Sequence, residues 1–205
     1  MGLRLQLRQA QAQAGDIALL YADESEALTH PYLAHAWPMP GPCLAHAWAE
    51  RGADLRVQAP GQSRKVALMG ALDAGTGELV VSTSPTKVSA DFIALLRRLD
   101  WRYGPKPGDT RLLVVLVLDN GPIHTSKASR AALAERPWLT VEWLPRYAPE
   151  LNQIERTWRD LKRHHLAHRT FKDADDLTAT IHAAIKQLNA ERMNAHPCDK
   201  LEKAA

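Results

Sequence analysis

Residues 112–124 read LLVVLVLDNGPIH and include the longest purely aliphatic run of the chain, Leu112 to Leu118. This run is far shorter than the roughly 20 apolar residues that cross a bilayer, so it predicts a buried central strand. The sequence Asp-Asn-Gly-Pro follows directly and is typical of a turn. The strand therefore ends on a carboxylate, which makes Asp119 a candidate functional residue.

Two further acidic residues stand in comparable places. Asp23 ends an apolar stretch and predicts a second strand from Ile17 to Asp23. Glu155 follows a Pro-containing turn, in a helix that we expect from Asn152 to about His165. Because ligands gather at the carboxyl edge of parallel strands, Asp23 and Asp119 are expected to lie side by side there.

The remaining patterns complete an alternating order of strands and helices. The turn DAGTGE predicts a hairpin, and Ser89 is expected to cap a helix whose apolar face starts at Phe92. The other expected elements are a helix over 3–14, hairpin strands over 65–71 and 78–84, helices over 89–101, 126–135 and 174–190, and a strand over 140–144. A hairpin beside β–α–β units predicts an α/β fold, a mixed β-sheet flanked by α-helices that resembles the ribonuclease-H-like fold.

The composition fits a single globular domain over residues 1–205, with 45% hydrophobic and 24% charged residues. Residues 1–15 lack the apolar core of a signal peptide, which predicts a cytoplasmic protein. The net charge is +3, and residues 146–172 alone hold seven Lys or Arg against three acids. A polyanion lying beside Glu155 explains this cluster, and a solvated helix face with pairs such as Glu155 and Arg159 is the alternative.

Three carboxylates from separate elements at one rim suit a pair of hard divalent cations. In phosphodiester chemistry, two Mg²⁺ ions about 4 Å apart activate an oxygen nucleophile and stabilise the leaving oxygen. A simpler explanation stays open for each acid. Asp23 ends a strand in a turn, Asp119 is an Asx-turn residue, and Glu155 forms a capping box with Asn152.

A short duplication interrupts the pattern, since Leu33–Trp37 (LAHAW) recurs as Leu44–Trp48. Three prolines between the copies forbid a regular element there. We therefore expect residues 33–48 to form a surface loop that a tandem duplication has lengthened. A functional pair of tryptophans is the alternative.

The motifs around the three acids resemble those of DDE transposases of the mariner-related bacterial insertion-sequence superfamily. YADES around Asp23 is similar to the first catalytic block of this family, and DNGPIH from Asp119 is similar to its Asp-Asn-x-x-x-His block. Residues 144–162, LPRYAPELNQIERTWRDLK, match the third block almost position by position, although Gln153 stands where the family often has Pro. The resemblance extends over residues 15–190.

The resemblance implies a catalytic domain that cleaves phosphodiester bonds at transposon ends and transfers strands into target DNA. It implies two Mg²⁺ or Mn²⁺ ions held by Asp23, Asp119 and Glu155. Asn120 and His124 would support this site. The residues expected to contact DNA are Arg146, Arg159, Lys162 and Arg163. The implied partners are double-stranded DNA, at the transposon ends and at the target, and a second copy of the chain in a homodimer on DNA. The implied location is the bacterial cytoplasm, with association to the nucleoid when on DNA and no membrane.

The family usually carries N-terminal helix-turn-helix segments, whereas only residues 1–22 precede Asp23. We expect residues 1–15 to be a helical extension, residues 191–205 to be a polar tail, and the helix-turn-helix region to be absent. The chain is then a fragment, a degenerate copy, or one product of a split reading frame that works with a separate N-terminal DNA-binding product. Two alternatives to a transposase stay open. One is a stand-alone ribonuclease-H-like nuclease, and the other is an inactive DNA-binding remnant or partner subunit.

Overall fold

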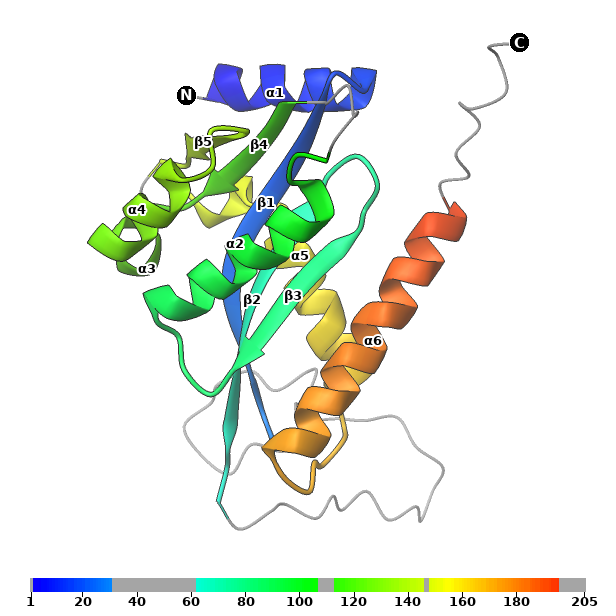
Figure 1. Ribbon diagram of the computed structural model, residues 1–205. Helices are drawn as coiled ribbons and strands as arrows, with labels where there is room; N and C mark the ends of the chain where they lie inside the picture. The colour runs from blue at the N-terminus through cyan, green and yellow to red at the C-terminus, as the bar shows by residue number, and fades with distance from the viewer. Residues whose placement is uncertain (1, 31–61, 107–112, 146–147, 196–205) are drawn as a thin grey trace.

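The computed structural model describes residues 2–30, 62–106, 113–145 and 148–195, which are built around a five-stranded sheet of order β3-β2-β1-β4-β5 (Figure 1). The strands are β1 Ile17–Leu28, β2 Lys65–Asp73, β3 Leu79–Ser84, β4 Leu113–Leu118 and β5 Leu139–Trp143. Pairing is antiparallel between β1, β2 and β3, and parallel between β1, β4 and β5. The expected mixed sheet, with the first and fourth strands as parallel neighbours, is therefore confirmed.

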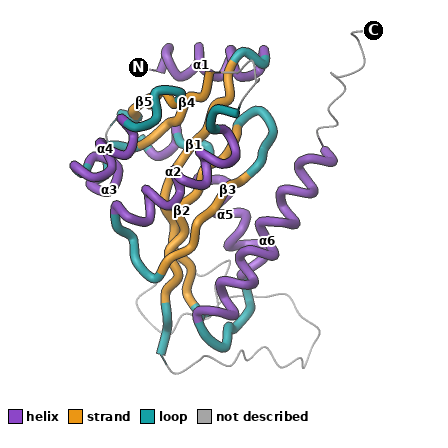
Figure 2. Tube along the Cα trace, in the orientation of Figure 1, coloured by secondary structure: helices purple, strands orange, loops and turns teal. Residues whose placement is uncertain are grey.

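Helices cover both faces of this sheet (Figure 2). The α-helices are α1 Gly2–Ala14, α2 Ser89–Tyr103, α3 Pro122–Thr125, α4 Lys127–Ala134, α5 Ile154–Asp160 and α6 Ala174–Ala195. A 3₁₀ turn, Pro149–Leu151, precedes α5, and a π-helix, Leu161–Leu166, follows it. Apolar residues of α1, α5 and α6 form one core with the sheet, and those of α2 and α4 form a second core on the opposite face.

Strand β1 divides its side chains between these two cores. Leu19 and Tyr21 belong to the core under α5, whereas Leu20 and Ala22 belong to the core under α2. Successive side chains of a strand point to opposite faces, so the next residue, Asp23, faces the α5 side and Glu24 faces the α2 side.

The prediction that Asp23 ends its strand is wrong, because β1 continues to Leu28. Strand β2 pairs with this extension all the way from Leu20 to Leu28. The parallel partner β4 stops earlier, and Tyr21 with Val117 is the last pair that joins the two strands. Asp23 therefore lies within a strand but just beyond the end of its parallel neighbour, where the sheet is open on that side.

Helix boundaries differ from the predictions for local reasons. The cap position of α2 is Val88 rather than Ser89, because the Asp91 carboxylate accepts a hydrogen bond of 2.9 Å from the Val88 N–H. The helix expected over 126–135 is preceded by a separate short helix, α3, and the Ser126 side chain caps α4 by accepting from the Ser129 N–H. The last helix continues to Ala195, so residues 191–195 belong to α6 and not to a tail.

The helix expected from Asn152 to about His165 begins at Ile154 and changes to a π-helix at Leu161. Leu161 and Leu166 are both buried against the same core although they are five positions apart in sequence. A π-helix, with its i to i+5 hydrogen bonds, has a wider turn than an α-helix, and this wider turn brings both side chains to one face. The helical pattern predicts four inward residues around this helix. Ile154, Trp158 and Leu161 are buried, whereas Leu151 is only partly buried against the same core. The duplicated loop over 33–48 lies outside the described residues.

Gly70 allows α5 to approach the sheet closely. It is the β2 residue that pairs with Asp23, and a Cβ atom on it would overlap with the indole ring of Trp158 on α5. Trp158 itself is only 2% exposed and belongs to the larger core. Because Glu155 is almost one helical turn before Trp158, the position of this indole also fixes where Glu155 stands relative to Asp23.

None of the described helices is both long enough and apolar enough to cross a membrane.

We predict that Gly70→Ala lowers the free energy of unfolding by about 1–3 kcal/mol, as overpacking a dense core does. Gly75→Ala is the matched control, because a Cβ there would meet only the Asp73 carboxylate, at an ordinary contact distance of 3.4 Å. Urea unfolding followed by tryptophan fluorescence compares the two variants. Equal midpoints for Gly70→Ala and Gly75→Ala would contradict the tight approach of α5.

Candidate active site

A cavity of about 560 Å³ opens where β1 extends past the end of β4. Asp23 comes from β1, Asp119 and Asn120 follow β4, and Glu155 is on the first turn of α5. The remaining lining residues come from the turn after Asn120 and from the segment between β5 and α5: Gly121, Pro122, Leu144, Pro145, Ala148 and Asn152. The three acids that the sequence singled out therefore line one cavity, although they are distant in sequence.

Asp119 is held by two donors on one of its oxygens. Its Oδ1 accepts a 2.9 Å hydrogen bond from the Gly121 N–H and lies 2.6 Å from Nδ1 of His124. The hydrogen bond to His124 and then the Gly121 N–H lower the pKa of Asp119, against the opposing effect of burial. The Asx-turn contact proposed as the simpler explanation does form, and it leaves Oδ2 as the oxygen that can serve the cavity.

His124 is buried, with only 1% of its surface exposed, and its ring packs edge-on against Phe92 at 4.7 Å between centroids. The Asn120 amide donates a 2.6 Å hydrogen bond to the carbonyl of Leu144, the residue that follows β5. Both residues expected to support the site therefore hold the turn that carries Asp119. His124 contacts the Asp119 carboxylate, and Asn120 ties the turn to the end of β5.

The capping box proposed for Glu155 does not form. The Asn152 side chain donates instead to the carbonyl of Ala22, at 3.1 Å, and α5 has no side-chain cap. Glu155 bonds to Asn152 only through its backbone N–H, and its side chain is exposed at the cavity. Asn152 was read only as a helix cap from the sequence, yet it ties the start of α5 to the residue before Asp23.

Asp23 carries the strongest electrostatic perturbation of the site. Burial, followed by the negative charges of Glu24, Glu155 and Asp119, raises its pKa from an ordinary 3.8 to about 8. The N–H of Glu24 opposes this rise through a backbone hydrogen bond. Carboxylates placed this close repel one another, so the carboxylates alone resist full ionisation and would gain from positive charge.

Among the described residues, Lys162 brings a positive charge near the acids. Burial lowers the pKa of Lys162, and the negative charges of Glu155, Glu26 and Asp23 oppose that effect. Arg159 and Arg163 are exposed on the same stretch of helix. Arg146, the fourth residue expected to contact DNA, lies outside the described residues.

The donor types at the cavity suit a hard divalent cation, because Asp23, Asp119 and Glu155 offer carboxylate oxygens. The Oδ1 atom of Asn152 is also enclosed at this cavity without a hydrogen-bond partner among the described residues. Within that part of the chain, however, no three His, Cys, Asp or Glu side chains converge closely enough to hold a metal ion. The acids therefore share a cavity without meeting at one point.

A mixed sheet in this strand order, with helices on both faces, defines the ribonuclease-H-like class, and solved structures agree. The chain belongs to the DDE superfamily endonucleases, whose family model matches residues 18–178. The Mos1 mariner paired-end complex with Mn is similar over 93% of this chain and 58% of that chain, with a TM-score of 0.57 and 18% identity. The catalytic domain of Mos1 mariner transposase has a TM-score of 0.55 at 16% identity, over 93% of this chain and 86% of that one. At these identities the likeness shows the fold.

Curated relatives come from bacterial sequences. A Shigella sonnei protein, described as the insertion element IS630 uncharacterized 39 kDa protein, is 38% identical over 143 residues. That match covers 70% of this chain and 37% of the relative. An uncharacterized protein of Sinorhizobium fredii is 32% identical over 74 residues, which cover 36% of this chain and 52% of the relative. The chain therefore corresponds to about a third to a half of the length of these relatives.

We predict that the metal-free protein becomes less stable as the pH rises from about 4 to about 8. In this window the folded state keeps a proton on Asp23, whereas the unfolded chain, with a pKa near 3.8, releases it. Asp23→Asn should remove this part of the pH dependence and raise the free energy of unfolding by about 1–3 kcal/mol near neutral pH. Urea unfolding in EDTA at several pH values measures it, with the exposed Asp16→Asn as control. Parallel pH profiles for wild type and Asp23→Asn would refute the perturbed carboxyl.

Proposed function

We propose that this chain is the catalytic domain of a DNA transposase, which cleaves phosphodiester bonds at transposon ends and joins the freed 3′ ends to target DNA. The observation that carries the proposal is the cavity at which Asp23, Asp119 and Glu155 arrive from three separate elements. Membership in the DDE superfamily endonucleases supports the reaction class.

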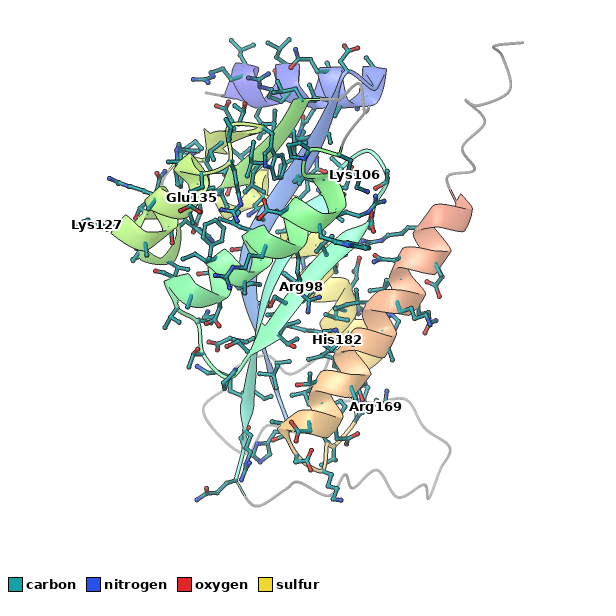
Figure 3. All side chains as sticks on the ribbon, viewed as in Figure 1. Arg98, Lys106, Lys127, Glu135, Arg169 and His182 are labelled. Atoms are coloured by element: carbon teal, nitrogen blue, oxygen red, sulfur yellow. The ribbon has the colours of Figure 1, made fainter. Side chains whose placement is uncertain are left out.

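Two other cavities among the described residues differ from this one in their charged groups. A cavity of about 520 Å³ beside α1 has the carboxylates Glu150 and Asp160 in its lining, together with the guanidinium groups of Arg156 and Arg192. A cavity of about 440 Å³ lies at the β3 edge and is lined by residues that include Arg98 and His182, both labelled in Figure 3. Its one carboxylate, Glu78, is paired with Arg102 at 2.9 Å. Cation-assisted phosphodiester chemistry needs carboxylates that are free to bind the cations. This requirement favours the cavity at Asp23 as the place of the reaction.

We propose two Mg²⁺ or Mn²⁺ ions as cofactors, with Asp23, Asp119 and Glu155 as the residues that would hold them. Such ions, when bound, activate the attacking oxygen and neutralise charge at phosphorus. The chain contributes the rest. Asn152 holds α5, and with it Glu155, against β1, and the cations would relieve the repulsion that raises the pKa of Asp23.

DNA would reach the cavity across α5, whose first turn carries Glu155, and across the π-helix that follows it. Arg159 and Arg163 are exposed there, and Lys162 lies within electrostatic reach of Glu155 and Asp23. Phosphate groups bound by these side chains would be held beside the carboxylates. A homodimer on paired DNA ends and a separate N-terminal DNA-binding product stay predictions of the family resemblance.

A strand-transfer assay on DNA that carries the transposon ends tests the proposal against its alternatives. Joined product that Asp119→Asn abolishes supports a transposase. Cleavage without joining would instead indicate a stand-alone nuclease. DNA binding without either reaction would indicate an inactive remnant or a partner subunit.

We predict that Asp23→Asn, Asp119→Asn and Glu155→Gln each lower the rate of cleavage by about a thousandfold. Each substitution removes a charge that would hold a cation, and metal ions contribute several kcal/mol to such reactions. Glu150→Gln is the control, because Glu150 is in the 3₁₀ turn just before α5 but does not line this cavity. Single-turnover cleavage with Mn²⁺ is the measurement. Glu155→Gln at the wild-type rate would exclude Glu155 from the site.

We predict that Arg159→Ala, Lys162→Ala and Arg163→Ala each weaken DNA binding, and that each flattens the dependence of log affinity on log salt concentration by about 0.9. Lys127→Ala on α4, labelled in Figure 3, is the control from the opposite core of the sheet. Fluorescence anisotropy across a series of salt concentrations measures both quantities. An equal loss with Lys127→Ala would show that the chain binds DNA without using this helix.

A further inference from the structure

Glu24 is an acid that the proposed reaction does not use, and its position is unusual. It follows Asp23 directly, yet it lies on the α2 side of the sheet while Asp23 lies on the α5 side. Its side chain is 19% exposed, and its Oε2 atom is enclosed without a hydrogen bond to any residue that the structure describes. An enclosed carboxylate oxygen of this kind calls for an explanation.

Among the described residues, a basic atom of His124 lies close to this oxygen. Nε2 of His124 lies 3.6 Å from Oε2 of Glu24, and Nδ1 of the same ring lies 2.6 Å from Oδ1 of Asp119. An ionised carboxylate can only accept a hydrogen bond, so Nδ1 is the donor to Asp119. The buried ring thus spans two carboxylates and makes a T-shaped contact with Phe92.

The topology explains how two acids on opposite faces reach one site. Strand β4 ends at Leu118, and the chain then turns into α3, whose His124 side chain reaches Glu24 on the part of β1 that β4 does not pair with. His124 thereby connects the α2 side, where Glu24 lies, to Asp119 at the rim of the cavity.

We propose that Glu24 is a positioning residue, which acts through His124 to hold the Asp119 carboxylate with its Oδ2 atom toward the cavity. The Glu24 carboxylate faces Nε2 of the ring at 3.6 Å, and Nδ1 of the ring together with the Gly121 N–H occupies Oδ1 of Asp119. The carboxylate can then rotate little, and Oδ2 is left for a cation. Hydrogen-bond partners behind a metal ligand orient it in this way. The inference rests on the proposed function, since it assigns Glu24 to the same cation site.

The test is the binding of Mn²⁺, measured by isothermal titration calorimetry, in a cycle of Glu24 and His124 variants. Glu24→Ala is expected to weaken Mn²⁺ binding about tenfold, the lower end of what such partners contribute. His124→Asn places an amide near Nδ1 that can still reach Asp119 but not Glu24. If Glu24 acts through the ring, Glu24→Ala should have no further effect in the His124→Asn background. A full and additive loss in that background would overturn the proposal, because it would show a direct effect of the Glu24 charge.

Two controls separate a positioning role from loss of fold or charge. Glu26→Gln removes a carboxylate from the same strand, where it pairs with Lys65 and Lys87, and should bind Mn²⁺ as the wild type does. Thermal unfolding shows whether Glu24→Ala is folded, and Glu24→Gln, which keeps the side-chain shape, replaces it if it is not. In histidine-labelled protein, the Nδ1 proton of His124 should exchange faster with water in the Glu24 variant than in the wild type. An unchanged exchange rate would overturn the proposal.

Asp119→Asn distinguishes this inference from the proposed function. If Asp119→Asn leaves Mn²⁺ binding intact, the cation site itself is misplaced and the proposed function fails. If Asp119→Asn abolishes binding while Glu24→Ala binds as tightly as the wild type, the site stands and only the role of Glu24 is overturned.

Discussion

The unequal length of two parallel neighbours, β1 and β4, is the constraint on which the rest of the site depends. Their pairing ends at Tyr21 and Val117, whereas β1 continues to Leu28 with β2 as its partner. The unpaired flank of β1 leaves room for a cavity on one face and for a buried histidine beside it. A longer β4 would close both places, because neighbouring strands lie only about 4.8 Å apart.

The second requirement is that α5 lies flat against β1 and β2. Gly70 permits the contact by leaving space for Trp158, and Asn152 anchors the start of the helix on Ala22. The Gly70 contact sets the distance between α5 and the sheet, and the Asn152 hydrogen bond sets where along β1 the first turn of α5, with Glu155, lies. Packing of the apolar core and placement of the site therefore depend on the same helix, because α5 buries Trp158 in the core and carries the Glu155 carboxylate to the cavity.

Much of the fold follows from the sequence alone because its strands and helices have strong periodic patterns. The run that ends at Leu118 could hardly be anything but a central strand, and the face marked by Phe92 and Leu99 is buried as expected. The sequence pattern predicts the end of β1 at Asp23 rather than at Leu28, because Glu24 and Glu26 make the second half of the strand polar. That half is a strand since β2 supplies its partner, and sequence pattern cannot report a partner so distant along the chain.

The acidic residues of the site could be predicted from the sequence, but the hydrogen bonds that position them could not. Asp23, Asp119 and Glu155 were recognisable from their flanking motifs, and they line one cavity. Asn152 looked like a helix cap because the local pattern Asn-x-x-Glu fits a capping box. A long-range acceptor, the Ala22 carbonyl, takes its amide instead. Local patterns predict local hydrogen bonds, and they fail where a tertiary partner competes for the same group.

The Asn152–Ala22 bond joins residues that are 130 positions apart. Closing a chain segment of this length costs conformational entropy, which has to be paid before the contact stabilises the fold. During synthesis, β1 leaves the ribosome long before α5 exists, so the three acids cannot meet on a nascent chain. The cavity is thus assembled only when the domain is nearly finished, and a chain cut short before α5 would carry two of the acids without a site to place them in.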